Sequence, residues 1–288
     1  MTAWGKTERL AAGDLWIRDF RCWGEKRPFV KEEARDVGGA PGPLAKGDAR
    51  DVAVELPRLG AHVRSCGRDT FVVDATAIAI LCADATYLRA SPSAAPQTST
   101  LLTLSGELAE RLARAKCRVE VSRASAAAHE KILASASPLE LHERTLALVE
   151  AIAVDAGEPS SGLAGGRSPP PSWKRLATQV QYVLATRYAE ALSLDDVARA
   201  CAVSAFHAAR VFRAVTGRSI HQQLVRVRIH HALYELSAGA GALTAVARRA
   251  GFSSHSHFTS TFRRVLGVAP SEIAASPRAL RAAMTRRL

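Results

Sequence analysis

The side chains best suited to bind an anion are concentrated in the last part of the chain. Residues 172–288 hold 17 Lys and Arg against 5 Asp and Glu, whereas residues 1–171 hold 22 of each kind. The C-terminal part therefore supplies the whole formal net charge of +12. A general bias toward arginine would add charge to both parts, so the asymmetry favours an anionic partner, with nucleic acid ahead of a membrane surface.

Cysteine is another residue type that could carry chemistry. The chain has five cysteines: Cys22, Cys66, Cys82, Cys117 and Cys201. No Cys-x-x-Cys motif or close pair suggests metal ligation, so free and mostly buried thiols are one interpretation. The alternative is a redox sensor, for which Cys66 is the best candidate because Arg64 and Arg68 flank it and neighbouring cations favour the thiolate.

Within the basic part a pattern of residues occurs twice, about 50 residues apart. The paired positions are Val197-Ala198 with Val246-Ala247, Ala202-Val203-Ser204 with Gly251-Phe252-Ser253, Phe212-Arg213 with Phe262-Arg263, and Gly217 with Gly267. So consistent a repeat indicates two copies of one structural unit. Each copy predicts a short helix, a tight turn and a longer helix, which is the layout of a helix-turn-helix unit.

In the first copy, Ser193 and Asp196 have the spacing of a helix-capping pair. The chain is expected to turn at Ala202-Val203, and Ser204 to cap the second helix. Helical spacing predicts that the second helix buries Ala208, Val211, Phe212 and Val215. The opposite face of this helix would then be free for DNA.

In the second copy, Thr244 can cap the first helix, Gly251 permits the turn, and Ser253 or Ser254 caps the second helix. That helix is predicted to bury Phe258, Phe262, Val265 and Leu266 and to expose Ser254, His255, Ser256, Thr259 and Ser260.

Between the copies, residues 220–236 form an amphipathic stretch with Leu224, Val227, Leu233 and Leu236 inward. A rigid helix here would fix the two units relative to each other. Two second helices that enter successive major grooves on one DNA face must lie roughly 34 Å apart.

Several motifs of the basic part are similar to those of a known family. They are Leu194-Asp195-Asp196-Val197-Ala198, Val203-Ser204-x-Phe206-His207, Arg210-x-Phe212-Arg213-x-x-x-Gly217, Arg226-x-Arg228, Val246-Ala247-x-x-x-Gly251-Phe252-Ser253, Ser256-His257-Phe258-x-x-x-Phe262-Arg263 and Gly267-x-x-Pro270. Together they resemble the DNA-binding domain of AraC/XylS-type transcription regulators over about residues 173–275. The N-terminal part is more weakly similar to the cupin-like sensory domains of that family.

The resemblance implies base contacts from both second helices, at Phe206, Ala209, Arg210, His255, Ser256, Thr259 and Ser260. Arg210 is the best single candidate because a guanidinium can bond guanine O6 and N7 together, although a phosphate contact or a solvated position is the alternative. Ala209 and Ser260 are shorter than the side chains that some members use, so the second copy is expected to rely on His255 and Thr259.

Phosphate contacts are assigned to a second set of residues: Ser204, Arg213, Arg218, Ser254, Arg263 and Arg264. For any one of these arginines a solvated surface charge is an equal alternative. His207 and His257 are given structural roles.

The N-terminal part predicts an α+β protein with a β-rich, cupin-like barrel or sandwich followed by helices. Its expected strands are Trp16–Phe20, Val52–Val54, Thr70–Val73, Ala77–Leu81 and Leu101–Leu104. After Ser105 the spacing becomes helical, and Ser137-Pro138-Leu139-Glu140 predicts a helix start. The stripe that follows, Leu141, Leu148, Val149 and Ile152, is expected to pack on the barrel, to form a dimer interface, or both.

Residues 155–171 are rich in Gly, Pro and Ser and are interpreted as a flexible linker without helix or strand. The predicted domains are therefore a sensory or dimerisation domain at 1–154 and an all-α double helix-turn-helix domain at 172–288.

An enzyme is the main rival interpretation of the N-terminal domain, because cupin-like barrels often bind a metal through a His-x-His cluster. Only His62, His129 and His142 precede the linker, and they form no such cluster. His255 and His257 lie on a predicted helix, where positions i and i+2 do not share a face. We therefore expect no catalysis, no metal and no cofactor.

The function expected from the sequence is that of a bacterial, cytoplasmic transcription regulator that binds promoter DNA and touches RNA polymerase. We expect it to act as an activator. No secretory signal or membrane span is recognised in the sequence. A small-molecule effector and homodimerisation through the helices of the N-terminal domain complete the hypothesis. A ligand-independent architectural protein, whose N-terminal domain only dimerises, is the alternative.

Overall fold

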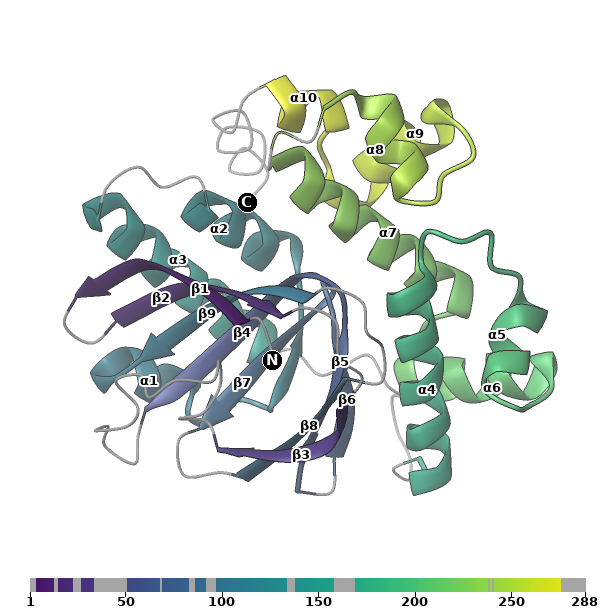
Figure 1. Ribbon diagram of the computed structural model, residues 1–288, viewed down its shortest axis with the longest axis horizontal. Coiled ribbons are helices and arrows are strands. Elements are labelled where there is room, and N and C mark those ends of the chain that lie inside the picture. Colours follow the sequence, from purple (N-terminus) through teal and green to yellow (C-terminus); the bar gives the residue numbers. More distant parts are fainter. Residues whose placement is uncertain are drawn as a thin grey trace.

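The computed structural model describes residues 4–12, 15–22, 27–33, 51–67, 69–82, 86–91, 97–133, 138–157, 169–237, 239 and 241–275. It has a β-rich N-terminal part, with three helices on one face of the strands, and an all-helical C-terminal part (Figure 1). The expected α+β class is confirmed. None of the described helices combines the length and hydropathy needed to cross a membrane.

The strands form two antiparallel sheets. The first has the order β1 (Trp4–Ala12), β2 (Leu15–Cys22), β9 (Gln97–Leu104), β4 (Val52–Leu59), β7 (Ala77–Cys82) and β10 (Arg118–Glu120). The second has the order β3 (Arg27–Glu33), β8 (Thr86–Ser91), β5 (His62–Cys66) and β6 (Asp69–Val73). Each predicted strand lies within one of these ten. In the part of the chain that the structure describes, no ladder joins the two sheets, so the domain is a two-sheet sandwich and not a single closed barrel.

Alternating residues of the central strand β4 serve two different cores. Val54 lies opposite Ile80 of β7 and Leu102 of β9, and all three face the helices. The neighbouring residue Ala53 belongs to the core between the sheets, together with Phe71. Because successive side chains of a strand point to opposite faces, an apolar strand of this kind is buried on both sides.

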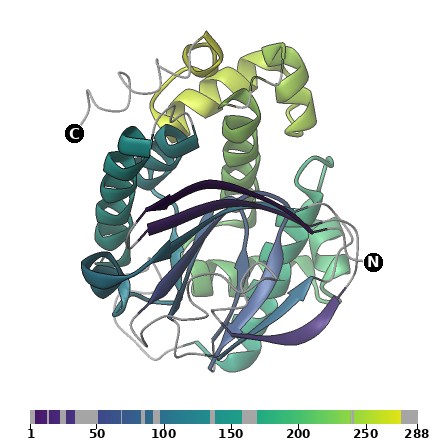
Figure 2. The ribbon, with the colours of Figure 1, turned by 60° about the vertical axis from the view of Figure 1, so that its left-hand side comes forward.

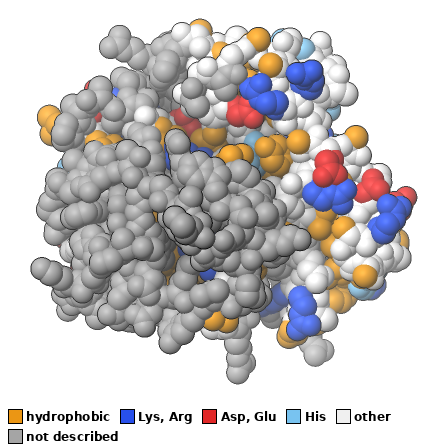
Figure 3. All heavy atoms as spheres, viewed as in Figure 1, with side chains coloured by type: hydrophobic (Ala, Val, Ile, Leu, Met, Phe, Trp, Pro, Cys, Tyr) orange, Lys and Arg blue, Asp and Glu red, His pale blue; other side chains and the backbone are white. Residues whose placement is uncertain are grey.

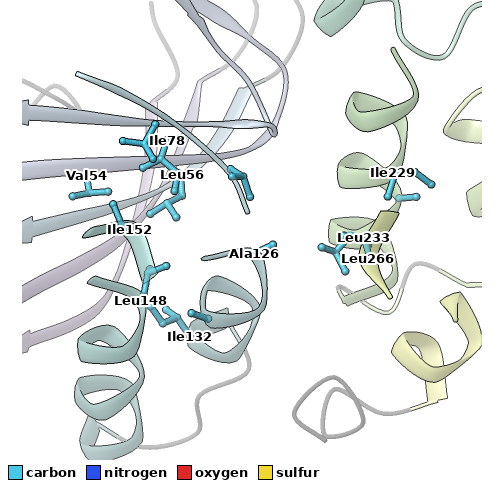
Figure 4. Close-up of a cluster of buried hydrophobic side chains, with 14 of the residues drawn as sticks. Val54, Leu56, Ile78, Ala126, Ile132, Leu148, Ile152, Ile229, Leu233 and Leu266 are labelled. Atoms are coloured by element: carbon cyan, nitrogen blue, oxygen red, sulfur yellow. The ribbon is translucent and has the colours of Figure 1, made fainter. Parts of the chain in front are cut away.

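The helix-covered face of the first sheet carries α1 (Gly106–Leu112), α2 (Arg123–Leu133) and α3 (Pro138–Gly157). The predicted stripe of α3 packs on this sheet: Leu148 and Ile152 are fully buried and lie beside Val54 and Ile78 (Figure 4). Pro138 is the first residue of α3, as predicted, whereas Ser137 lies outside the described residues.

The bounds of the predicted linker need correction. Helix α3 continues to Gly157, and the next helix begins at Pro171, although residues 155–171 were expected to hold no helix. Glycine is common at the C-terminal end of a helix, and proline fits the first turn of the next. Gly157 and Pro171 therefore mark helix ends, and their presence does not exclude a helix. Residues 158–168 lie outside the described part of the chain.

The described residues of the C-terminal part form a series of seven helices. They are α4 (Pro171–Arg187), α5 (Leu194–Ala200), α6 (Ala205–Thr216), α7 (Ile220–Ser237), α8 (Leu243–Arg249), α9 (His255–Leu266) and α10 (Pro270–Ala275). Helix α7 lies between the strands and the last helices in both ribbon views (Figures 1 and 2). Leu224, near its start, packs with α4–α6, whereas Ile229 and Leu233 belong to the cluster that continues to Phe262 of α9 and to the N-terminal sheet.

Three of the four buried histidines in the described part of the chain make the fold sensitive to acid. Burial lowers the pKa of His62 to about 4, of His230 to about 3 and of His231 to about 4, from 6.5. Each group therefore contributes stability above pH 6.5 that is lost as the pH falls toward its folded pKa. Burial also raises the pKa of Glu130 to about 7, which acts in the opposite direction between pH 4.5 and 7.

We predict that the free energy of unfolding falls from pH 7 to pH 5, by about 2–3 kcal/mol per pH unit at the steepest point, because about two more protons bind to the unfolded chain. Urea unfolding at pH 7, 6 and 5 measures this slope. His231→Gln should flatten it by about one proton. A wild-type free energy of unfolding that does not change with pH would contradict the lowered pKa values of the buried histidines.

Two phenylalanines on equivalent helices should differ sharply in their contribution to stability. Phe262 is 0% exposed and Phe206 is 77% exposed. Phe262→Ala leaves a cavity and should cost about 3–5 kcal/mol, whereas Phe206→Ala should cost at most about 0.5 kcal/mol. Chemical denaturation of the two variants gives both values. Equal losses of stability would contradict the burial of Phe262 and the exposure of Phe206.

Candidate nucleic-acid interface

The first helix-turn-helix unit is α5, a turn and α6. Ser193 Oγ accepts from the Asp196 amide (3.1 Å) and Asp196 Oδ2 accepts from the Ser193 amide (3.0 Å), so the predicted capping pair is confirmed. The Ser193 hydroxyl donates to Asp196 Oδ2 at 2.6 Å, and this bond, with the Ser193 amide and Arg199, lowers the pKa of Asp196 to about 2. The turn passes through Ala202 with φ 55°, and Ser204 Oγ caps α6 by accepting from the His207 amide at 3.3 Å.

The second unit is α8, a turn and α9. Ser254 Oγ caps α9 by accepting from the His257 amide at 3.2 Å, which resolves the choice between Ser253 and Ser254. The prediction that Thr244 caps α8 is wrong: the helix begins at Leu243, and its cap position is Ala242, without a side-chain bond. The extended backbone at Ala242 starts the helix two residues earlier, so Thr244 lies within its first turn.

A glycine is required between α8 and α9 for two reasons. Gly251 has φ +83°, which L side chains rarely adopt, and a Cβ there would lie 2.8 Å from the Tyr188 carbonyl oxygen. The same carbonyl accepts from Arg228 Nε at 2.8 Å, and Arg228 Nη2 donates to the Glu190 carbonyl at 2.7 Å. The C-terminal end of α4 is therefore bonded to α7 directly beside the turn of the second unit.

The predicted base-contacting side chains lie on the faces of α6 and α9 away from their cores. Exposed members are Phe206, Arg210, His255, Ser256 and Ser260, while Ala209 and Thr259 are half-buried. The guanidinium of Arg210 lies 5.4 Å from the Trp173 ring centroid, a cation–π contact that orients it. Ser260 Oγ donates to the His257 carbonyl at 3.1 Å, so its hydroxyl is engaged with its own helix.

The predicted phosphate contacts divide into two groups. Arg213, Arg263 and Arg264 are exposed, and Ser204 and Ser254 are exposed residues whose hydroxyls cap their helices. On the face shown in Figure 3, Lys and Arg side chains are scattered over the helical part, several beside Asp or Glu. Arg218, by contrast, forms an ion pair with a residue of the N-terminal domain.

Arg218 Nη1 lies 2.6 Å from Glu120 Oε1, at the end of β10. Glu120 also faces Arg226 (3.6 Å) and Arg118 (3.8 Å), and these guanidinium groups lower its pKa against the opposing effect of its burial. In this arrangement Arg218 is not available to a phosphate. The sequence could not reveal the contact, because Glu120 and Arg218 lie far apart along the chain.

The N-terminal domain also reaches the second unit. Arg123, at the start of α2, donates from Nε to the Val265 carbonyl (2.7 Å) and from Nη2 to the Arg264 carbonyl (2.9 Å) at the end of α9. His129 of α2 lies 3.0 Å from the Tyr234 hydroxyl of α7. Both helix-turn-helix units are therefore tied to the N-terminal domain through α7 and its neighbours.

Comparison with known proteins agrees with this geometry. Residues 197–276 match a family model described as a helix-turn-helix domain. This region is a helix-turn-helix domain of the AraC/XylS type.

Relatives of this AraC-type domain are regulators by name. The chain is similar to the melibiose operon regulatory protein of Escherichia coli (strain K12), with 32% identity over 95 residues that cover 33% of this chain and 32% of that protein. It is similar to the HTH-type transcriptional activator AarP of Providencia stuartii, with 34% identity over 28% of this chain and 59% of that protein. The chain thus matches about a third of the first relative and less than two thirds of the second.

Among solved structures, the chain is similar to a transcriptional regulator with an AraC-type DNA-binding domain from Chromobacterium violaceum. The identity is 25%, the match covers 38% of this chain and 96% of that one, and the TM-score is 0.35.

The three N-terminal histidines considered as metal ligands lie in three separate environments. His62 lies inside the sandwich, 3.4 Å from Glu55, whose carboxylate also accepts from Arg64 Nη2 at 2.8 Å. His129 lies between Tyr234 and Thr100, while His142 is exposed. Within the described residues, no group of three His, Cys, Asp or Glu could hold a metal ion.

The requirement for glycine in the AraC-type domain gives a matched test. Gly251→Ala should destabilise the domain by more than about 2 kcal/mol, because the Cβ adds a clash to the cost of the left-handed backbone. Gly239 has φ +75° but nothing within 4 Å of an added Cβ, so Gly239→Ala should cost only about 1–2 kcal/mol. Unfolding experiments compare the two, and equal losses would refute the close approach at Gly251.

Proposed function

We propose that this protein is a sequence-specific DNA-binding transcription regulator. The observation that carries the proposal is the pairing of two capped, exposed second helices, α6 and α9, on one connecting helix. The positive charge of the C-terminal part supports the proposal, because phosphate neutralisation dominates the affinity of proteins for DNA. The names of the relatives support the same function and do not suggest catalysis.

Within this proposal, Arg210 of α6 and His255 with Thr259 of α9 read bases, while Arg213 and Arg263 contact phosphates. Phe206 is an exposed aromatic side chain at the start of α6, suited to contact with a thymine methyl group.

The central test is the binding of purified full-length protein to sheared genomic DNA at two salt concentrations. Wild-type protein should select a motif with two half-sites about one helical turn apart. Arg210→Ala should lose the motif in the half bound by α6, with a cost of about 1–3 kcal/mol. Arg210→Lys is the sharper variant, because it keeps the charge and loses the bidentate geometry.

Arg175→Gln is the matched control, because it removes an exposed positive charge of α4 outside the predicted contacts. It should keep the motif. Binding without any motif, erased by salt in every variant, would support the alternative of an architectural DNA-binding protein.

We further propose that the N-terminal domain governs the DNA-binding domain in response to a small molecule, in the cytoplasm of a bacterium, with contact to RNA polymerase and activation as the outcome. Support comes from the docking of Glu120 and Arg123 on the DNA-binding domain. The division of the chain into two domains between α3 and α4 belongs to this proposal.

Homodimerisation is proposed through α3. Leu139 and Val154 of this helix are 71% and 67% exposed, and Leu146 is 38% exposed, although Leu148 on the opposite side is buried. Leu139→Glu with Val154→Glu should convert a dimer to a monomer, as measured by sedimentation. An unchanged sedimentation coefficient would remove α3 from the interface.

A further inference from the structure

A cleft lies between the N-terminal domain and the DNA-binding domain. Its volume is about 510 Å³, which falls in the range of small-molecule sites. Val121 and Arg123 line it from the N-terminal side, and the start of α7 and the end of α9 line it from the other. No Asp or Glu is among the lining residues that the structure describes.

The lining is strongly basic. It includes Arg123, Arg218, Arg226 and Arg264, with His221 and His230. The nearest carboxylate shown by the contacts, Glu120, is shared among Arg118, Arg218 and Arg226, so one negative charge faces three guanidinium groups. Asp74 lies farther in, and its burial favours its neutral form by raising its pKa. The cleft therefore keeps an excess of positive charge.

Two buried polar atoms of lining residues have no hydrogen-bond partner within the described part of the chain. They are Nδ1 of His230, which is 3% exposed, and Nε of Arg226. A buried polar group without a partner is unfavourable, so the protein's own groups leave the polar wall of the cleft partly unsatisfied. Val225 and Leu266 give the cleft apolar walls beside the charges.

We propose that this cleft binds a small organic anion with a carboxylate or phosphate group, held by Arg264 from the DNA-binding domain and by Arg123 from the N-terminal domain. The anion would supply the missing negative charge among the arginines, whose guanidinium groups suit carboxylate and phosphate oxygens.

Such an anion would favour the docked arrangement of the two domains, because both contribute to its site. In that arrangement Arg218 is bound to Glu120 and not to a phosphate. By linkage, the anion weakens DNA binding to the same degree that DNA weakens anion binding. This consequence rests on the proposed function, whereas the anion site itself does not.

The test is isothermal titration of the full-length protein with succinate and with inorganic phosphate at constant ionic strength, with neutral succinamide as the control ligand. At least one of the two anions should bind, and succinamide should not. Arg264→Gln should weaken anion binding at least tenfold, whereas Arg175→Gln, which removes an exposed charge outside the cleft, should not. Absence of binding by both anions, or equal binding to Arg264→Gln, would overturn the site.

A second titration measures DNA affinity with and without the anion that binds. A loss of affinity confirms the coupling, and unchanged affinity overturns the coupling. Since the first titration contains no DNA, failure of the anion site and failure of the proposed DNA-binding function give different results.

A separate observation concerns Cys66 and Cys117. Their Sγ atoms lie 2.8 Å apart, at the end of β5 and just before β10. Arg64, expected to activate Cys66, is instead bonded to Glu55 inside the sandwich, and Arg68 lies outside the described residues. Redox chemistry at Cys66 is therefore supported by the nearby Cys117 thiol and not by a flanking arginine.

We infer that Cys66 and Cys117 form a disulfide with hydrogen peroxide as oxidant. The Cys66 thiolate attacks one peroxide oxygen and gives a sulfenic acid, releasing hydroxide that takes a proton to become water. The Cys117 sulfur then attacks the sulfenic sulfur, and its proton leaves with the hydroxyl group as a second water. Two thiols are oxidised and one peroxide is reduced. Burial raises the pKa of Cys117 to about 12, so Cys117 enters the second step as a thiol, and Cys66 is the residue assigned to attack the peroxide.

Peptide mapping of peroxide-treated protein under non-reducing conditions tests this inference. The expected product is a linked peptide pair containing Cys66 and Cys117, absent from Cys117→Ser and retained in Cys201→Ser, which changes a thiol of the other domain. Cys66 found as sulfinic acid without the link, or linked to Cys82, would overturn it.

Discussion

The arrangement depends on the burial of helix α7. This helix is buried on nearly all sides: Leu224 faces the first unit, Leu233 faces the second, and Gln223 donates to Thr76 of the N-terminal domain at 3.2 Å. A helix enclosed in this way cannot rotate or bend without opening several cores at once. The distance between α6 and α9 is therefore set by protein packing before any DNA is bound.

A second constraint is the pairing of arginines of the DNA-binding domain with a carboxylate of the N-terminal domain. The DNA-binding domain presents arginines on its outer face, but it also directs Arg218 and Arg226 toward the N-terminal domain, where Glu120 receives both. Ion pairs at a part-buried interface depend on geometry, and removal of one partner leaves the other charge unpaired. The same residues that could strengthen DNA binding thus also contact the N-terminal domain.

Local signals in the sequence were reliable where the chemistry is local. The pairing of Ser193 with Asp196, the cap at Ser204 and the glycine at 251 are each decided within a few residues, and the structure has them as predicted. The prediction that Thr244 caps α8 was wrong because another residue, Ala242, adopts the extended cap conformation.

Long-range features were not predictable. Strands β5 and β8 were missed because their buried residues include Arg64 and Arg89, which sequence patterns treat as exposed. Residues 220–236 were expected to have a polar face, but His230 and His231 are buried there, since the N-terminal domain and Tyr188 cover that side. The contact of Arg218 with Glu120 depends on how two domains dock, which no local pattern encodes.

The most direct test of the account is the affinity of the protein for its selected DNA site as the spacing between the half-sites is varied by single base pairs. If α7 holds the two recognition helices rigidly, affinity has a sharp maximum near one helical turn, and insertion of half a turn lowers it at least a hundredfold, which is about 2.7 kcal/mol. Affinity that does not change with spacing would show that the two units bind DNA independently, and would contradict the account.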